Sequence, residues 1–402
     1  MAIWRSTNWF SKRLERNTVP NNENERSLVY HWTNGSIQLV SKLLRQLNNT
    51  QPGFMFLNPG VTNSLPAEDN VYLWIPSSDL TTPVLKPYTS GLVFPAGAFG
   101  KGRFILLTYT YNRFMYHIWD GSNINNAEPK YAWGNETASP MDNDTENWAA
   151  GCITYANNKF MVLPYNDAAR AGDVLVSANG WNWTTYTDVL PSAIYMWSTV
   201  CYNNVTSKWL AYNDQIKQFW RSDDEGASWS KASDSPHSSS SQTIAFGGGK
   251  YVLTDSAYNV NQVYVSTDDG ETWSTQGLGH SLEFITQVIW NEYDSQFVLI
   301  GGAWPGDGTI DARVSTSPDG ITWTARETGS TKTRLANVQG DNLGNYVSMG
   351  AAYASSNNLA TSTYMYSTNS GVSWSSGTLP QTLYAGPGRP NRLIWGDIKL
   401  GL

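Results

Sequence analysis

One short motif, a glycine followed three residues later by a tryptophan, recurs along this sequence and limits what the chain can fold into. Its tryptophans are Trp183, Trp229, Trp273, Trp323 and Trp374, at spacings of 46, 44, 50 and 51 residues. Each copy follows an alternating, strand-like run that ends in Ser, and two further strand-like runs lie upstream. About four strands in roughly 40–50 residues is the period of a β-propeller blade. The sequence therefore predicts an all-β propeller of four-stranded blades.

The motif has a local physical explanation, clearest in the copy from Ser266 to Trp273. The carboxylate of Asp268 can accept backbone N–H groups inside a tight turn, and Gly270 can supply the positive φ that the turn needs. The tryptophan then starts an outer strand and can pack between adjacent sheets. The residues expected to build these structural turns are Asn179, Gly180, Trp183, Ser222, Asp224, Gly226, Trp229, Ser266, Asp268, Gly270, Trp273, Asp319, Gly320, Trp323, Asn369, Gly371 and Trp374.

The repeats do not account for every blade. Residues 92–134 contain strand-like runs with a degenerate turn, and we expect one more blade there. The last strand-like run, residues 391–400, has no motif after it and can pair with residues 71–91, so that both chain ends share one blade. Such closure removes exposed sheet edges. The propeller is expected to span residues 66–402 with seven blades, six being the alternative.

Residues 1–65 do not follow the repeat and form a separate N-terminal arm. Ser36 can cap a short helix over residues 36–47, with apolar side chains on one face. Residues 1–50 carry seven Lys and Arg against three Asp and Glu, a balance of +4 that leaves −11 for the rest of the chain. Two interpretations stay open: the helix packs on the side of the propeller, or the arm docks on another protein.

Composition excludes several classes of protein. An acidic body argues against nucleic acid as the main partner, because phosphate binding needs a basic surface. No apolar run approaches the roughly 20 residues of a membrane span, and the first residues lack the apolar core of a signal peptide. We therefore expect a protein made in a cytoplasm and not inserted in a membrane. Cys152 and Cys201 fall in equivalent strands of successive repeats and are expected to be buried.

Aromatic and polar residues recur in the loops opposite the motif turns. A sugar ring needs an aromatic platform beside Asn or Asp side chains, and four successive blades offer this combination. The alternative is that they are ordinary turns with structural tyrosines. The candidate glycan-binding residues are Tyr165, Asp167, Tyr212, Asp214, Tyr258, Trp304 and Asp307.

The motif resembles the Asp box, Ser-x-Asp-x-Gly-x-Thr-Trp, also called the BNR repeat, of sialidases and many non-catalytic propellers. The match is complete from Ser266 to Trp273. A sialidase also needs three arginines, the first in a Phe/Tyr-Arg-Ile-Pro segment, and neither Arg103 nor Arg113 lies in such a segment. The four histidines lack metal-ligand spacing. We expect no catalytic residue, no cofactor and no metal.

Variants such as residues 317–324, Ser-Pro-Asp-Gly-Ile-Thr-Trp-Thr, look like repeats in structural proteins of tailed bacteriophages. The resemblance implies a non-enzymatic virion protein, made in the host cytoplasm and present in several copies. It would be anchored to capsid or tail proteins through residues 1–65, with the propeller meeting host-surface glycans. The alternative is a carbohydrate-active enzyme of the sialidase-like, Asp-box type.

Overall fold

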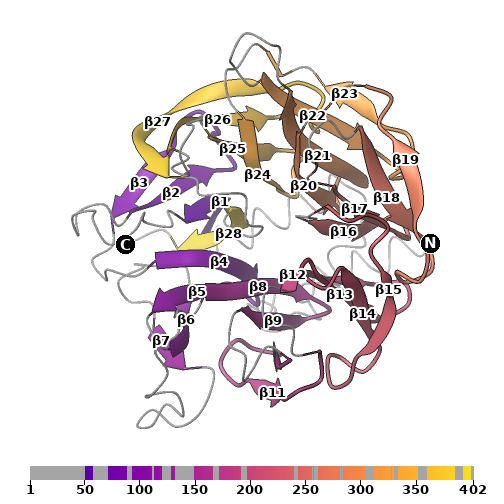
Figure 1. Cartoon of the computed structure of the whole chain (residues 1–402). Helices are drawn as coiled ribbons and strands as arrows, with labels where there is room; N and C mark the ends of the chain where they lie inside the picture. Colours follow the sequence, from indigo (N-terminus) through magenta and orange to yellow (C-terminus); the bar gives the residue numbers. More distant parts are fainter. Residues whose placement is uncertain are drawn as a thin grey trace, which may run out of the picture. The chain divides into compact units, whose positions relative to one another are not determined.

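Figure 1 shows the computed structural model of the chain, whose described residues are rich in β-strands. The described residues are 50–57, 71–87, 93–110, 113–119, 128–131, 149–165, 172–191, 197–239, 243–255, 257, 261–280, 282, 284–303, 311–326, 328–329, 334–351, 360–384 and 393–399. The chain divides into two compact units, residues 1–51 with 398–402 and residues 52–397. Nearly all described residues belong to the second unit. The helix expected over residues 36–47 lies outside them.

The described strands form seven four-stranded antiparallel sheets. The sheet that joins the chain ends contains β28 (Leu393–Lys399), β1 (Thr50–Leu57), β2 (Val71–Pro76) and β3 (Val84–Pro87), in that order. The next three contain β4 (Val93–Gly100), β5 (Arg103–Thr110), β6 (Arg113–Trp119) and β7 (Glu128–Tyr131); β8 (Ala149–Ala156), β9 (Lys159–Tyr165), β10 (Val174–Ser177) and β11 (Thr184–Tyr186); and β12 (Trp197–Asn203), β13 (Lys208–Asn213), β14 (Gln218–Ser222) and β15 (Ser230–Asp234).

The last three sheets contain β16 (Ile244–Gly247), β17 (Lys250–Leu253), β18 (Gln262–Ser266) and β19 (Ser274–Gly277); β20 (Phe284–Asn291), β21 (Gln296–Ala303), β22 (Asp311–Ser317) and β23 (Thr324–Arg326); and β24 (Arg334–Gly340), β25 (Tyr346–Ala351), β26 (Ala360–Ser367) and β27 (Ser375–Tyr384). The predicted propeller of four-stranded blades is confirmed, and the described residues supply seven such sheets.

The sheets follow one another around a ring, with the first strand of each sheet innermost (Figure 1). First strands of neighbouring sheets contact each other from β4 through β8, β12, β16 and β20 to β24. At the closing sheet, a Cβ placed on Gly97 of β4 would lie 2.6 Å from Cδ1 of Ile394 in β28. The hydrophobic cores lie between neighbouring sheets, so each blade is stabilised by both of its neighbours.

The closing sheet begins earlier in the sequence than expected. Its predicted partners, residues 71–91 and 391–400, do share a sheet, but β1 lies between them. Residues 50–57 were expected in the N-terminal arm, so the propeller begins before residue 66. In the structure a Cβ on Gly53 would lie 2.4 Å from Cζ2 of Trp74, so the glycine allows the close approach of two paired strands.

The Asp-box turns connect the third and fourth strands of five sheets. In the turn between β18 and β19, Asp268 Oδ1 accepts a hydrogen bond from Thr272 N at 2.9 Å. Ser266 Oγ donates to the same carboxylate oxygen at 2.8 Å and accepts from Gly270 N at 3.0 Å. Gly270 has a φ of +81°. Short-range hydrogen bonds therefore define the turn, as the sequence indicated.

The box turns come in two lengths, which explains the one-residue shift seen in the sequence. In the longer copies the residue before the glycine also has a positive φ, as at Glu225, Asp269 and Ser370. In the shorter copies, such as the one at Asp319, the carboxylate accepts from the backbone N–H groups two and three residues later, those of Ile321 and Thr322. The tryptophan adopts the same role in both, packing into the core shared with the preceding sheet; the five are Trp183, Trp229, Trp273, Trp323 and Trp374.

A repeated contact joins four of the five Asp-box turns, and the turn between β2 and β3, to the preceding sheet. The residue that starts the second strand of one sheet, or for Asn345 the residue just before that strand, reaches the turn after the third strand of the next sheet, and we call this contact the latch. In two copies it is an ion pair, Lys159 with Glu225 and Lys208 with Asp269. In the others a side-chain nitrogen donates to a turn carbonyl: Arg103 to Asn179, Gln296 to Ser370, and Asn345 to Ser77.

The last of these contacts identifies a degenerate box in the closing sheet. Asp79 Oδ1 accepts from Thr81 N at 2.9 Å, and Oδ2 accepts from Thr82 Oγ1 at 2.9 Å. The turn has neither the glycine nor the tryptophan of the motif, and the side chain of Leu80 is buried. The remaining signal in the sequence is Ser77-x-Asp79, which alone is too short to identify a box.

Candidate functional site

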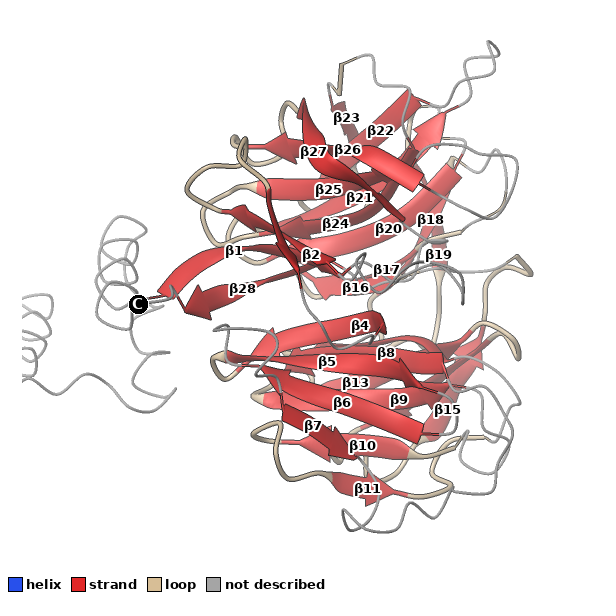
Figure 2. Ribbon diagram, turned by 90° about the vertical axis from the view of Figure 1, so that its left-hand side faces the viewer, coloured by secondary structure: helices blue, strands red, loops and turns tan. Residues whose placement is uncertain are grey.

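The antiparallel order inside each sheet gives the ring two different faces. Turns after the first and third strands lie at one edge, which we call the box face because it carries the Asp-box turns. Connections after the second and fourth strands lie at the opposite edge, the loop face. In the side view of Figure 2, the arrow of β28 points toward the box face. The candidate glycan-binding residues belong to segments that join second and third strands, so the loop face is the candidate site.

Two of these candidates lie in the described part of the loop face. The ring of Tyr212 is 0% exposed and packs on Phe219 with a centroid distance of 4.7 Å, so it offers no face to a sugar. This corrects the expectation that Tyr212 is a binding platform. Asp214 is partly exposed and holds its turn by an ion pair with Lys217 at 2.9 Å. It remains a candidate polar contact.

The other candidates cannot be placed in the same detail. Tyr165 is the last residue of β9, but its side chain lies outside the described residues. Asp167, Tyr258, Trp304 and Asp307 lie outside the described residues altogether. Of the seven, the described structure brings together Tyr212 and Asp214, since Tyr212 Oη donates a hydrogen bond to Asp214 Oδ1 at 3.3 Å.

A cluster that the sequence did not reveal lies at the loop face, between the sheets β12–β15 and β16–β19. The ring of His237 stacks on Tyr264 with centroids 4.9 Å apart. Its Nδ1 lies 2.9 Å from Ser239 Oγ, and Ser239 donates to Asp255. Asp255 Oδ1 also accepts from Ala257 N at 2.9 Å. The side chains of His237 and Asp255 are each 5% exposed.

The chemistry of this cluster is that of a structural network. In a Ser-His-Asp triad the imidazole lies between the hydroxyl and the carboxylate. Here Ser239 Oγ lies between the ring of His237 and Asp255, so its proton is directed to the carboxylate. Burial lowers the pKa of His237, which disfavours the imidazolium form. The three side chains join the connection after β15 to the connection after β17. They follow no motif spacing in the sequence that would have identified them.

A second histidine makes a smaller contact on the next sheet. His280 Nε2 lies 2.5 Å from Ser315 Oγ, whose side chain is fully buried. Burial, reinforced by the charge of Arg313, lowers the pKa of His280. Arg313 in turn lies 3.5 Å from Asp311. These groups tie the connection before β20 to β22.

Polar side chains also link the innermost strands. Thr243 Oγ1 accepts from Val288 N at 2.8 Å, and Gln287 Oε1 accepts from Val338 N at 2.7 Å. Each contact joins one sheet to the next. Gln287 directly follows a β-bulge in β20, and Asn337 holds the equivalent position in β24. Asn337 is 1% exposed and has no hydrogen-bond partner for either amide atom among the described residues. A buried amide without a partner is costly, which makes Asn337 a test of this linkage.

The described residues contain neither a group of metal ligands nor an exposed cysteine thiol of lowered pKa. No three His, Cys, Asp or Glu side chains in them are grouped as metal ligands. Cys152 and Cys201 are unpaired thiols, and burial raises the pKa of Cys152 to about 12. Within the same residues, no helix is long and apolar enough to cross a bilayer.

Comparison with known proteins gives only distant likenesses. No family model and no curated protein matches the chain. Among solved structures, the chain is similar to YCF48 bound to a D1 peptide, at 10% identity and a TM-score of 0.46, over 70% of this chain and 80% of that one. It is also similar to a GH74 xyloglucanase from Xanthomonas campestris, at 12% identity and a TM-score of 0.46, over 84% and 69%. The chain is a β-propeller of the Asp-box type, and that conclusion rests on its own sheets and turns.

Proposed function

We propose that this chain is a non-enzymatic structural protein of a tailed-bacteriophage virion. The part of the expected arm that precedes β1, residues 1–49, anchors it to capsid or tail proteins, and the propeller displays its loop face to glycans on the host surface. The resemblance of residues 317–324 to repeats in phage structural proteins motivates the choice of a virion.

One structural observation carries the proposed orientation. β1 starts at the box face, since it is the second strand of its sheet, so the chain preceding Thr50 is attached there. The segments with the candidate glycan-binding residues join second and third strands, at the opposite face. A protein held by its N-terminal residues would therefore present the loop face outward.

The described ionisable groups of the loop face support a display function. Asp214 pairs with Lys217, and Asp255 accepts hydrogen bonds from Ser239 and Ala257. Each contact fixes a connection between strands. Such a frame suits rigid presentation of loops, which lowers the entropy lost on binding.

Two experiments test the two halves of the proposal. Deletion of residues 1–49 is expected to abolish incorporation into particles while the propeller stays folded. Normal incorporation of the truncated chain would refute the anchor.

Trp304→Ala is expected to weaken binding to host cells and to glycan arrays. Its matched control is Trp181→Ala, an exposed tryptophan of a box turn, 41% exposed.

Equal binding by the Trp304→Ala and Trp181→Ala variants would remove the loop face from consideration as the glycan-binding surface. The same protein preparations also test for catalysis. Release of sugar from an array glycan by the wild-type protein would favour the carbohydrate-active enzyme instead.

A further inference from the structure

Exposed apolar side chains gather on the box face. Among the described residues, every large apolar side chain that is well exposed lies in a box-face turn or begins a strand directly after one. These residues are Val84, Trp181, Val205, Tyr293, Ile321, Leu343 and Val372. Exposed apolar groups gathered on one face of a folded ring indicate an interaction surface more strongly than scattered ones do.

Three of them, Tyr293, Leu343 and Val372, lie in turns that contact one another where the sheets β20–β23 and β24–β27 meet, and we call them the apolar patch. They are 37%, 37% and 48% exposed. A Cβ on Gly344, next to Leu343, would lie 3.6 Å from Cε1 of Tyr293 and 2.9 Å from Ser370 Oγ. Ser370, two residues before Val372, donates its N–H to the carbonyl of Gly344 at 2.9 Å.

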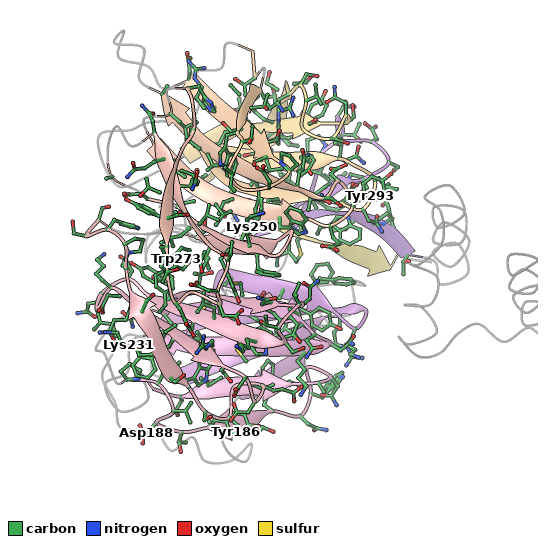
Figure 3. The ribbon with its side chains drawn as sticks, turned by 90° about the vertical axis from the view of Figure 1, so that its right-hand side faces the viewer. Tyr186, Asp188, Lys231, Lys250, Trp273 and Tyr293 are labelled. Atoms are coloured by element: carbon green, nitrogen blue, oxygen red, sulfur yellow. The ribbon has the colours of Figure 1, made fainter. Side chains whose placement is uncertain are left out.

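The turns of the apolar patch are held together rigidly. Ser370 Oγ donates to Asp294 Oδ1 at 2.7 Å, and Tyr346 Oη donates to Asp294 Oδ2 at 2.6 Å. Gln296 Nε2 donates to the carbonyl of Ser370 at 2.8 Å. The patch is therefore preorganised, and a partner would not need to order it. In Figure 3 Tyr293 lies toward the side of the ring to which β28 points, with Asp188 toward the other.

The charge around the apolar patch differs from the rest of the box face. The latch position is basic in four successive sheets, at Arg103, Lys159, Lys208 and Lys250, but it is Gln296 and then Asn345 here. The turns 290–296, 341–346 and 368–374 contain no Lys or Arg. They carry the exposed Glu292 and the partly exposed Asp294, whereas the third acid, Asp341, is buried. The patch thus combines apolar side chains with a local excess of carboxylates, which favours a basic partner.

We propose that the apolar patch binds a basic, apolar protein segment, and that residues 1–17 of a second copy of this chain are that segment. They contain four Lys and Arg against one Glu, together with Trp4, Trp9 and Phe10. The chain also enters β1 at the box face, where the patch lies. Patch-to-patch contact between two copies would instead oppose like charges. The inference rests on the proposed assembly in several copies but does not require a virion.

A peptide-binding experiment tests this inference. A fluorescently labelled peptide of residues 1–17 is titrated with the full-length protein, and its anisotropy is measured. We expect saturable binding that weakens when NaCl rises from about 0.05 to about 0.5 M, because salt screens exposed charges. The double variant Leu343→Ser, Val372→Ser is expected to bind at least tenfold more weakly. Both replaced side chains are exposed, and a thermal melt verifies that the variant is folded.

The matched control is Val205→Ser. Val205 is more exposed, at 72%, but lies in the turn that ends at Lys208, so its replacement should change binding less than twofold. A peptide with Lys12, Arg13 and Arg16 replaced by Gln should bind at least tenfold more weakly at low salt.

Three results would overturn the inference: no saturable binding to the wild type, unchanged binding to the double variant, or an equal loss in Val205→Ser. If residues 1–17 of the same copy occupied the patch, the labelled peptide would show no saturable binding to the wild type. The result of the peptide titration is independent of the anchor experiment, because incorporation of the truncated chain into particles does not measure binding of this peptide to the patch.

Discussion

Replacing the box glycine Gly270 by alanine tests the physical basis of the repeated turn. Gly270 has a φ of +81°, a region where an alanine side chain costs roughly 1–2 kcal/mol. A Cβ there would also lie 2.9 Å from both methyl groups of Leu210, which is fully buried and unable to move away cheaply. Overpacking of this kind costs about 1–3 kcal/mol. We expect Gly270→Ala to lower the free energy of unfolding by about 2–4 kcal/mol.

Two nearby glycines separate the two contributions. Gly279 has a φ of +72° and nothing within 4 Å of its Cβ position, so Gly279→Ala carries the backbone cost alone. Gly277 has an ordinary backbone and is equally open, so Gly277→Ala should be neutral or stabilise by about 0.4–1 kcal/mol. The expected order of stability is Gly277→Ala, then Gly279→Ala, then Gly270→Ala.

Thermal unfolding followed by circular dichroism measures the three variants side by side. With an unfolding entropy of about 2.1 cal/mol/K per residue over about 350 residues, 2–4 kcal/mol corresponds to a fall in Tm of about 3–5 °C. Equal Tm values for Gly270→Ala and Gly279→Ala would refute the contact with Leu210. Equal values for Gly279→Ala and Gly277→Ala would refute the backbone argument.

Three further variants probe other contacts. Lys208→Met leaves Asp269, which accepts from Asn203 at 2.7 Å, without its ion-pair partner, and should cost about 1–3 kcal/mol in urea unfolding; the exposed-pair control Lys231→Met should cost under about 0.5 kcal/mol. Gln287→Ala should lower the Tm by more than Asn337→Ala does, because Gln287 has a hydrogen bond to lose and Asn337 has none among the described residues; the reverse order in a melt would contradict the linkage. The backbone N–H of Thr322 lowers the pKa of Asp319 below its ordinary 3.8, so the stabilisation by the Asp319 carboxylate is complete above pH 3.8 and is lost as the pH falls through the lower folded pKa. Asp319→Asn should therefore flatten the fall in Tm between about pH 5 and pH 2. An unchanged slope of Tm against pH would contradict this role of Asp319.

The features that the sequence predicted correctly depend on neighbours close in the chain. Asp268 and Gly270 act within one turn, so the motif alone shows what each does. The period of the tryptophans likewise identified the blades, since each one packs against the adjacent sheet. The pairing of the two chain ends followed from the need to close a ring.

The features that it missed depend on contacts between distant residues. Gly53 is explained by the ring of Trp74 on the paired strand, which no local pattern announces. Tyr212 was expected at the surface, but Phe219 on the next strand covers it. His237 and Asp255 come from different segments, and only the fold brings them within 3.8 Å.

The closing sheet sets an order for folding. Among the described strands, β1, β2 and β3 are synthesised first and the innermost strand beside them, β28, is synthesised last. Until the ribosome has released residue 399, the growing chain carries an open sheet edge at β1, and such edges promote aggregation. Loss of β28 alone, through premature termination or proteolysis, would leave six complete blades and a three-stranded sheet that lacks the innermost strand of the ring closure. A break in a connection between two complete sheets would leave the pairing of β28 with β1 intact.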